Sequence, residues 1–277
     1  MKKDKTVLVL SDFHCGHLVG LTPPSRHSIY TGSNKVLLKF EQVRQQLWDM
    51  FSKIIKSLGV IDVLIVNGDL IEGKGSRSGG TELITTDRFQ QADMAAEIIR
   101  FIKPKKVAIT YGTPYHTGDE EDFEKVIVKE LRDGSNKYKP ESISLASHLY
   151  LNINGVKFDC KHHIASSSVP YGRTTAISRE NLWNLVWADT TNGSVPRSDV
   201  FIRSHVHYHV YSGDSQKLCM TTPALQGLGT KFGSRKCSGV VDWGVVVFNV
   251  TDKGEYTWRG IIPREVQQIQ KVNIVTM

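Results

Sequence analysis

Carboxylate and imidazole side chains recur in this sequence at one kind of position, immediately after short apolar runs. Such runs are typical of buried strands, and ligands gather at the carboxyl ends of strands in open α/β sheets. One Asp or His at a strand end is more often a turn former or a hydrogen-bonded core residue, but five successive cases favour a shared site. The residues are Asp12, His14, Asp69, His116, His162, His163, His205 and His207.

This mixture of side chains indicates a metal centre. Imidazole together with carboxylate suits Mn²⁺, Fe²⁺ or Zn²⁺, whereas all-oxygen sites favour Mg²⁺ or Ca²⁺. The candidates outnumber the ligands that one ion needs, and two ions about 3.5–4 Å apart that share a carboxylate would use them. We therefore expect two divalent metal ions, with Mn²⁺ favoured and Fe²⁺, Zn²⁺ or Mg²⁺ as alternatives.

The elements that must position these residues alternate between strand and helix in the first half of the chain. Apolar runs predict strands at 6–10, 61–66 and 107–110. Apolar residues at three- and four-residue steps predict a long helix over 36–58, ended by Gly59, and a second helix carrying residues 89–102. The spacing of Thr117 and Glu120 predicts a capping box that opens a third helix.

From about residue 143 the pattern becomes strand-rich. Asn154-Gly155 predicts a hairpin of 149–153 and 156–160, and further strands are expected at 200–202, 208–211, 217–221, 244–250 and 256–261. A helix is expected near 178–188, with Leu182, Leu185 and Val186 facing inward. We see no repeat or linker, so we expect residues 1–277 to form one α/β domain.

Composition bounds the class of protein. The 277 residues are 40% hydrophobic and 23% charged, which is typical of a globular chain and excludes a disordered or fibrous one. No apolar run approaches the roughly 20 residues of a membrane span, and no signal-peptide pattern opens the chain. Four dispersed cysteines without a C-x-x-C pair suit reduced thiols. We expect a cytoplasmic protein that binds no membrane; the oligomeric state stays open.

The order of the motifs resembles that of the calcineurin-like metallophosphoesterases, also called dimetal phosphoesterases. The resemblance runs from Asp12 to His207, through D-x-H, G-D, a G-(…)-H segment, H and H-x-H. It implies an α/β fold in which two mixed β-sheets pack as a sandwich with flanking helices. It also implies that Asp12, His14 and His207 bind the first metal and that Asp69 bridges both metals.

The same resemblance assigns the remaining histidines. His162 and His205 would bind the second metal, with His163 as the alternative to His162. His116 would be the catalytic histidine outside the metal shell, assisting the leaving oxygen while a metal-bridging hydroxide attacks phosphorus. His17 would either join the rim of the site or be solvated.

Two departures from the family pattern stand out. The third motif, normally G-N-H, reads Gly112-Thr113-Pro114-Tyr115-His116, so the Thr113 hydroxyl or a water would replace the Asn ligand. Asn67 is a weaker substitute, because its side chain should point to the other side of its strand. We therefore expect a more loosely held second metal. Ser204 stands where Gly is usual and is expected to be harmless; both departures resemble members encoded by bacteriophages.

Charge suggests the class of substrate. The formal net charge of +7 favours an anionic partner, nucleic acid first. Basic residues expected near the metal edge could bind a phosphate backbone. The predicted substrate-binding residues are Arg173, Arg179, Lys231 and Arg235.

We therefore predict a dinuclear-metal-dependent phosphodiesterase acting on nucleic acid. It resembles the nuclease branch that is related to double-strand-break-repair exonucleases. The alternatives are a phosphomonoesterase or a phosphodiesterase for small or cyclic nucleotides. A non-catalytic scaffold of the same fold, as in a retromer subunit, is the remaining possibility.

Overall fold

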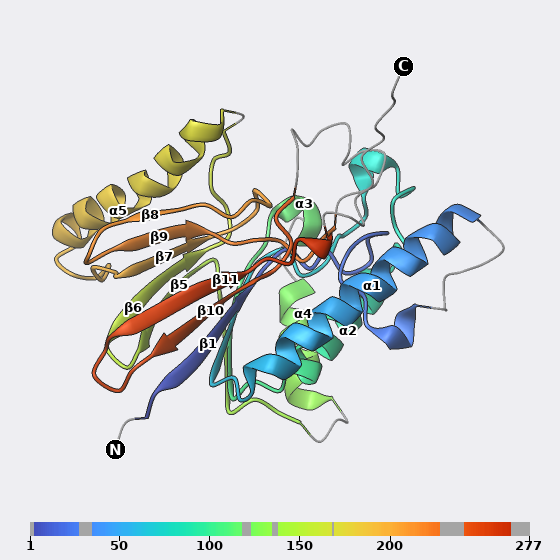
Figure 1. Cartoon of the computed structure of the whole chain (residues 1–277), viewed down its shortest axis with the longest axis horizontal. Helices are drawn as coiled ribbons and strands as arrows, with labels where there is room; N and C mark the ends of the chain where they lie inside the picture. The colour runs from blue at the N-terminus through green and yellow to red at the C-terminus, as the bar shows by residue number, and fades with distance from the viewer. Residues whose placement is uncertain are drawn as a thin grey trace.

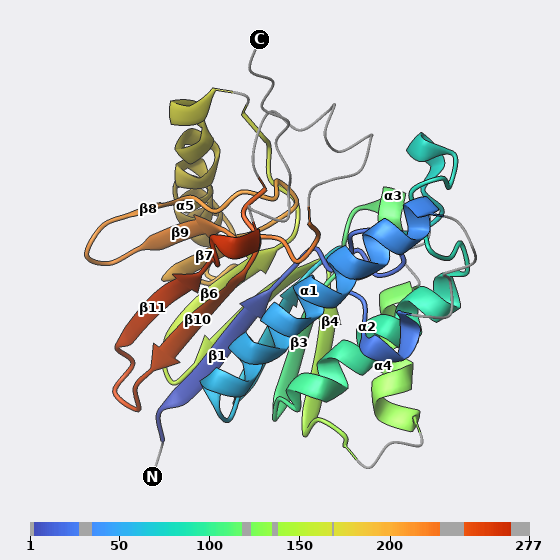
Figure 2. The ribbon, with the colours of Figure 1, turned by 45° about the vertical axis from the view of Figure 1, so that its right-hand side comes forward.

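The computed structural model describes residues 3–27, 35–117, 123–134, 138–167, 169–227 and 241–266. Within these ranges, two β-sheets lie face to face with helices on their outer sides (Figures 1 and 2). Each sheet contains both parallel and antiparallel neighbours. The predicted α/β class, with two mixed sheets and flanking helices, is confirmed.

The first sheet brings three of the motif-bearing strands together. Its order is β11 (Tyr256–Ile261), β10 (Val245–Val250), β1 (Lys5–Leu10), β2 (Val63–Asn67), β3 (Lys106–Thr110) and β4 (Ser142–Ala146). Strands β1 to β4 run parallel, so their carboxyl ends lie on the same edge of the sheet. β10 runs antiparallel to β1 and to β11.

The second sheet carries the paired histidines. Its order is β5 (His148–Ile153), β6 (Val156–Lys161), β7 (Val200–Arg203), β9 (Leu218–Thr221) and β8 (Tyr211–Gly213). The predicted hairpin is β5–β6, and its turn residues Asn154 and Gly155 both have positive φ, 54° and 110°. Positive φ at both central positions is the requirement of a type I′ turn.

Helices cover the two outer faces. α1 (Lys35–Leu58), α2 (Arg88–Ile102) and α4 (Phe123–Asp133) lie on the first sheet, and α5 (Arg173–Thr190) crosses the second (Figure 1). One short helix, α3 (Pro114–Thr117), and the 3₁₀ turns η1 (Pro24–Arg26), η2 (Ser76–Ser78) and η3 (Pro170–Gly172) lie in connecting segments. Residues 118–120 of the predicted capping box lie outside the described residues.

The core has two layers, which explains the unbroken apolar run of β1. Leu8 and Leu10 pack toward the helices, whereas Val7 and Val9 pack toward the second sheet with Phe158. Side chains alternate across a strand, so a strand buried on both faces needs apolar residues at every position.

The orientation predicted for α5 is wrong for two of its three residues, whereas Leu185 is half-buried. Leu182 and Val186, expected to face inward, are 60% and 42% exposed. The buried residues are Ile177, Asn184 and Ala188. The buried Asn184 bonds to the backbone at Pro196 and Ser198, so a polar residue faces the sheet and the apolar stripe faces outward. Trp183 and Trp187 stack on this outer face with ring centroids 5.8 Å apart.

None of the helices in the described ranges combines the length and the apolar character needed to cross a bilayer.

Candidate metal centre

The segments that follow β1 and β2 are held side by side by backbone hydrogen bonds. Asp12 N–H donates to Gly68 O at 3.1 Å, and His14 N–H donates to Asp69 O at 3.1 Å. In the second sheet, Ser204 N–H donates to His162 O at 2.8 Å. The pairing therefore continues past the strand ends, and it fixes the spacing of the residues that the motifs contribute.

Most of the motif residues share an unusual backbone conformation. Positive φ is uncommon for residues other than glycine, although Asp and His tolerate it better than most, and such strain concentrates at functional sites. Among the described non-glycine residues with positive φ, three lie elsewhere: Lys103, Asn154 and Asn192. The other five are Asp12 (53°), His14 (46°), Asp69 (50°), His205 (73°) and His207 (54°).

A first group of ligand atoms forms around Asp12. Its Oδ1 lies 3.2 Å from His207 Nε2 and 3.8 Å from His14 Nε2, and the two Nε2 atoms are 3.2 Å apart. Asp12 is fully buried, yet its Oδ1 makes no hydrogen bond with the described part of the chain. A buried carboxylate oxygen without a hydrogen bond, facing two imidazole nitrogens, fits a divalent cation.

Glu72 orients His14 as a metal ligand. The sequence alone did not assign Glu72 to the site. Its Oε2 lies 2.7 Å from His14 Nδ1, so Nδ1–H donates to the carboxylate and Nε2 is the nitrogen that faces the group. Burial works against the charged imidazole, but the nearby carboxylates of Asp12 and Glu72 raise the pKa of His14 to about 10, so a metal ion would displace the proton on Nε2. The one signal in the sequence was a third carboxylate three residues after Asp69.

A second group forms around Asp69. Its Oδ2 lies 2.9 Å from His162 Nε2 and 3.8 Å from His205 Nδ1. His162 Nδ1–H donates to Asn67 O at 2.7 Å, so Nε2 is the nitrogen that faces the site, where a metal ion would displace its proton. Burial opposes the charged form of His162, but the charge of Asp69 raises its pKa to about 9. His162 is buried and His163 is exposed, so His162 is the residue brought to this group.

Thr113, the predicted substitute for the missing Asn, lies against the same carboxylate. Its N–H donates to Asp69 Oδ1 at 2.7 Å, and its hydroxyl is 3.3 Å from that atom. A Cβ at Gly112 would come within 2.2 Å of Asp69 Oδ1, so glycine is required for this approach. The structure therefore places Thr113 where it orients Asp69.

His116 stands beside both groups on α3. Its Nδ1–H donates to Glu72 O at 2.9 Å, and its Nε2 lies 3.9 Å from Asp69 Oδ2. Its ring meets that of His14 edge-on at 4.6 Å. Burial lowers the pKa of His116, which favours a neutral ring with the Nε2 lone pair directed at the site. His14, Glu72 and His116 also form a third set with metal-compatible spacing.

The other predicted site residues lie farther out. The Arg173 guanidinium stacks on Tyr208, which adjoins His207, with 4.4 Å between its Cζ and the ring centroid. Arg179 is exposed on α5. Lys231 and Arg235 lie outside the described residues. His17 is buried, and its Nδ1 accepts the Val19 N–H at 3.2 Å, so it supports its own loop.

The cysteines found in the described ranges are structural. Cys15, Cys160 and Cys219 are buried free thiols. Burial raises the pKa of Cys15, next to His14, well above its ordinary value. A thiol with a raised pKa is a poor nucleophile, which agrees with the role expected for it.

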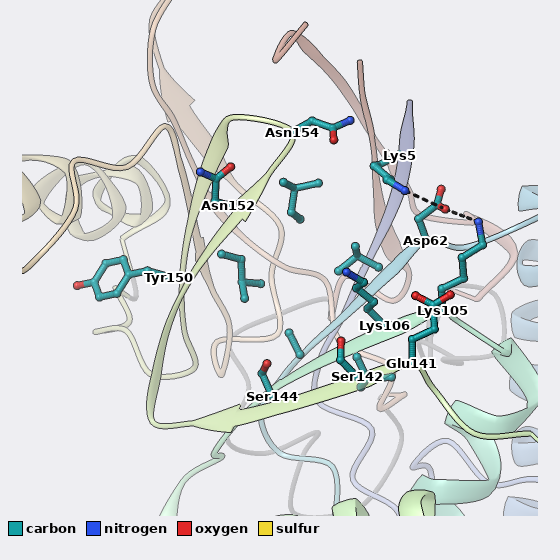
Figure 3. Close-up of a pocket in the computed structure, with 15 residues that line it drawn as sticks. Lys5, Asp62, Lys105, Lys106, Glu141, Ser142, Ser144, Tyr150, Asn152 and Asn154 are labelled. Atoms are coloured by element: carbon teal, nitrogen blue, oxygen red, sulfur yellow. Dashed lines mark hydrogen bonds and ion pairs between the residues drawn. The ribbon is translucent and has the colours of Figure 1, made fainter. Parts of the chain in front are cut away.

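A cavity of about 330 Å³ lies at the opposite end of the sandwich. It is lined by residues near the amino ends of β1 and β3 and along β4 and β5, among them Lys5, Lys106 and Ser142 (Figure 3). Asp62 pairs there with Lys105 at 2.7 Å and with Lys5 at 3.8 Å. The candidate metal groups lie past the carboxyl ends of the strands, so this cavity contains none of the predicted site residues.

No family model matches the chain, and no curated protein matches its sequence. Among solved structures, one similar chain is described as a novel archaeal phosphodiesterase, at 12% identity and a TM-score of 0.44, covering 92% of this chain and 99% of that one. Vacuolar protein sorting 29 from Cryptosporidium parvum has 10% identity and a TM-score of 0.43, covering 95% and 100%. Wild-type Vps29 from Entamoeba histolytica, complexed with zinc, has 13% identity and a TM-score of 0.38, covering 93% and 98%.

These identities and scores are low, so the likeness says nothing about the chemistry of this chain.

Proposed function

We propose that this protein is a phosphoesterase that holds two divalent metal ions. The observation that carries the proposal is the pair of groups past the strand ends of the two sheets, each with one buried carboxylate and two imidazoles. Asp12, His14 and His207 would hold one ion, and Asp69, His162 and His205 the other. Bound ions would supply charge that offsets the phosphate charge, and they would activate water as a nucleophile.

Other residues of the protein would position the metal ligands and transfer a proton. Glu72 holds the His14 ring, and Thr113 holds the Asp69 carboxylate, through the hydrogen bonds described above. His116 would exchange a proton with the leaving oxygen through Nε2, because its Nδ1 is committed to Glu72 O. In its neutral state, Nε2 would first take the proton that the attacking water releases, and the protonated ring would then give this proton to the leaving oxygen.

Nucleic acid is the substrate that we favour within this class. The net charge of +7 is one support, and Arg173 is the other. The Arg173 guanidinium stacks on the ring of Tyr208, which follows His207 in the sequence, and from there it could contact a substrate phosphate. Arg179, Lys231 and Arg235 remain candidates for binding the rest of the backbone.

Hydrolysis with Mn²⁺ tests this proposal. Bis-p-nitrophenyl phosphate, p-nitrophenyl phosphate, and labelled single- and double-stranded DNA would be compared, with Asp69→Asn as the blank. Cleavage of the diester and of DNA that disappears in the variant is the expected result. Monoester turnover without DNA cleavage would replace the nuclease by a phosphatase.

A scaffold role is the second candidate, and the outer face of α5 favours it. Leu182 and Trp183 are 60% and 50% exposed there, next to Trp187 at 40%. Exposed apolar patches of this kind often mark protein-binding surfaces. Metal binding without turnover of any of the four substrates would favour the scaffold role over the enzyme.

A further inference from the structure

A continuous series of hydrogen-bonded side chains connects residues that neighbour the metal groups in the sequence. Thr110 Oγ1 donates to Asn67 Oδ1 at 2.9 Å, and Asn67 Nδ2 donates to Ser204 Oγ at 2.7 Å. Ser204 Oγ lies 2.6 Å from Thr222 Oγ1, which lies 2.7 Å from Ser11 Oγ. All five residues are at most 1% exposed. This series of hydrogen bonds runs from Asn67 of the first sheet to Ser204 and Thr222 of the second, and it returns to the first sheet at Ser11.

The direction of the central bonds is fixed by a backbone carbonyl. Asn67 Nδ2 also donates to Lys161 O at 3.1 Å, and a carbonyl can only accept, so the orientation of the amide is set. Ser204 Oγ therefore accepts from Asn67. Its single hydrogen is left for Thr222 Oγ1, its other partner. Removing the Ser204 hydroxyl would leave one N–H of the buried Asn67 amide without its acceptor, and it would remove the partner that connects Thr222 Oγ1 to Asn67.

The members of this series occupy related positions in the sequence. Ser11 precedes Asp12, Ser204 precedes His205, and Asn67 comes two residues before Asp69. Lys161, whose carbonyl accepts from Asn67, precedes His162. Each of these ligands except His162 has positive φ, so its backbone conformation is one that the surrounding contacts have to hold.

We propose that Ser204 is a positioning residue, and that its hydroxyl locks the two metal groups to each other. The serine was expected to be a harmless replacement for glycine, but it is the link through which Asn67 of the first sheet reaches Thr222 of the second. The inference rests on the proposed metal binding, and it adds that tight binding in this protein requires the hydroxyl of Ser204. The hydroxyl itself contacts no ligand atom; it acts through Asn67 and Thr222.

Four variants test the proposal. Ser204→Ala and Thr222→Val each interrupt the series, whereas Thr222→Ser keeps the hydroxyl. Ser198→Ala is the matched control. Ser198 is as fully buried as Ser204, and it lies before the start of β7, whereas Ser204 follows the end of this strand. Mn²⁺ affinity, measured by calorimetry, should weaken by about 10-fold or more in the first two variants. It should stay close to the wild-type value in Thr222→Ser and Ser198→Ala.

Amide hydrogen exchange of the metal-free protein gives an independent readout. The Asp12 and His14 amides, which donate to Gly68 O and Asp69 O, should exchange faster in Ser204→Ala than in Ser198→Ala. Unchanged affinity and exchange in both Ser204→Ala and Thr222→Val would overturn the proposal, as would an equal effect of Ser198→Ala. If wild type bound no Mn²⁺, the proposed function would fail and the exchange comparison would still decide the role of Ser204. If Ser204→Ala did not fold, the two Thr222 variants would decide it.

Discussion

Glu72 Oε2 accepts a hydrogen bond from His14 Nδ1 at 2.7 Å, and this contact fixes which nitrogen of His14 faces the metal groups. Burial alone would raise the pKa of Glu72, but the hydrogen bond and the charge of His14 lower it to about 2. The carboxylate is therefore ionised throughout the physiological range. The same residue accepts from His116 through its backbone carbonyl, so Glu72 orients two histidines at once.

Glu72→Gln should weaken metal binding at the Asp12 group by about 10-fold, because an amide is a poorer partner for the Nδ1–H of a metal-bound imidazole. The His116 contact uses the backbone of Glu72 and should persist. Calorimetry with Mn²⁺ measures the effect. Glu82→Gln serves as the control, since Glu82 lies near His17, away from both groups. Equal affinities in the two variants would contradict the role of Glu72.

Gly68→Ala should disrupt the second group specifically. A Cβ at Gly68 would lie 2.3 Å from His162 Nδ1, and the φ of +83° adds strain. Gly59→Ala is a matched control, with a φ of +70° and nothing within 4 Å of its Cβ. Both variants should lose about 1 kcal/mol of unfolding free energy from the backbone. Only Gly68→Ala should also lose Mn²⁺ affinity, and a similar loss in Gly59→Ala would refute the explanation.

The His116→Ala variant should still bind metal ions, but it should hydrolyse substrate more slowly than wild type. The proposed role of His116 is proton transfer, which contributes on the order of 10² or more. Turnover of bis-p-nitrophenyl phosphate and Mn²⁺ affinity would be measured on the same preparation. His163→Ala, which removes an exposed histidine next to His162, should leave both nearly unchanged. A near-normal rate in His116→Ala would remove the residue from the mechanism.

The buried pair of Asp159 and Arg203 predicts a pH dependence of stability. Burial raises the pKa of Asp159, but the hydrogen bond from His148 and the charge of Arg203 lower it below its ordinary value of 3.8. A carboxylate with a lowered folded-state pKa stabilises the fold above its unfolded pKa, and this contribution is lost as the pH falls through the folded value.

Urea unfolding of the metal-free protein between about pH 5 and pH 2 should therefore show a shallower loss of stability in Asp159→Asn than in wild type. Asp133→Asn, at an exposed position on α4, should follow the wild-type slope. Identical slopes in all three proteins would show that Asp159 does not contribute to the acid transition.

Much of the site could be predicted because it depends on local pattern. Apolar runs located β1, β2 and β3, and the residues that follow them, Asp12 and Asp69, do meet at one edge. The hairpin at Asn154-Gly155 followed from the φ requirement of its turn. These features are local, since each depends on a few neighbouring residues.

The features that were not predicted depend on contacts distant in the sequence. Glu72 bonds to a residue 58 positions away, and no spacing rule connects the two. The hydroxyl of Ser204 gains its partners only when the two sheets meet. α5 was oriented wrongly because an apolar stripe was expected to face inward, whereas Asn184 faces the sheet and the tryptophans do not.

The number of Mn²⁺ ions bound per chain tests the central claim most directly. Native mass spectrometry with a calorimetric titration should show two ions in wild type, with the ion near Asp69 and Thr113 bound more weakly. His207→Ala should lose the tighter step and His205→Ala the weaker one, because these histidines belong to different groups. A wild-type stoichiometry below two, or loss of the same step in both variants, would contradict the account.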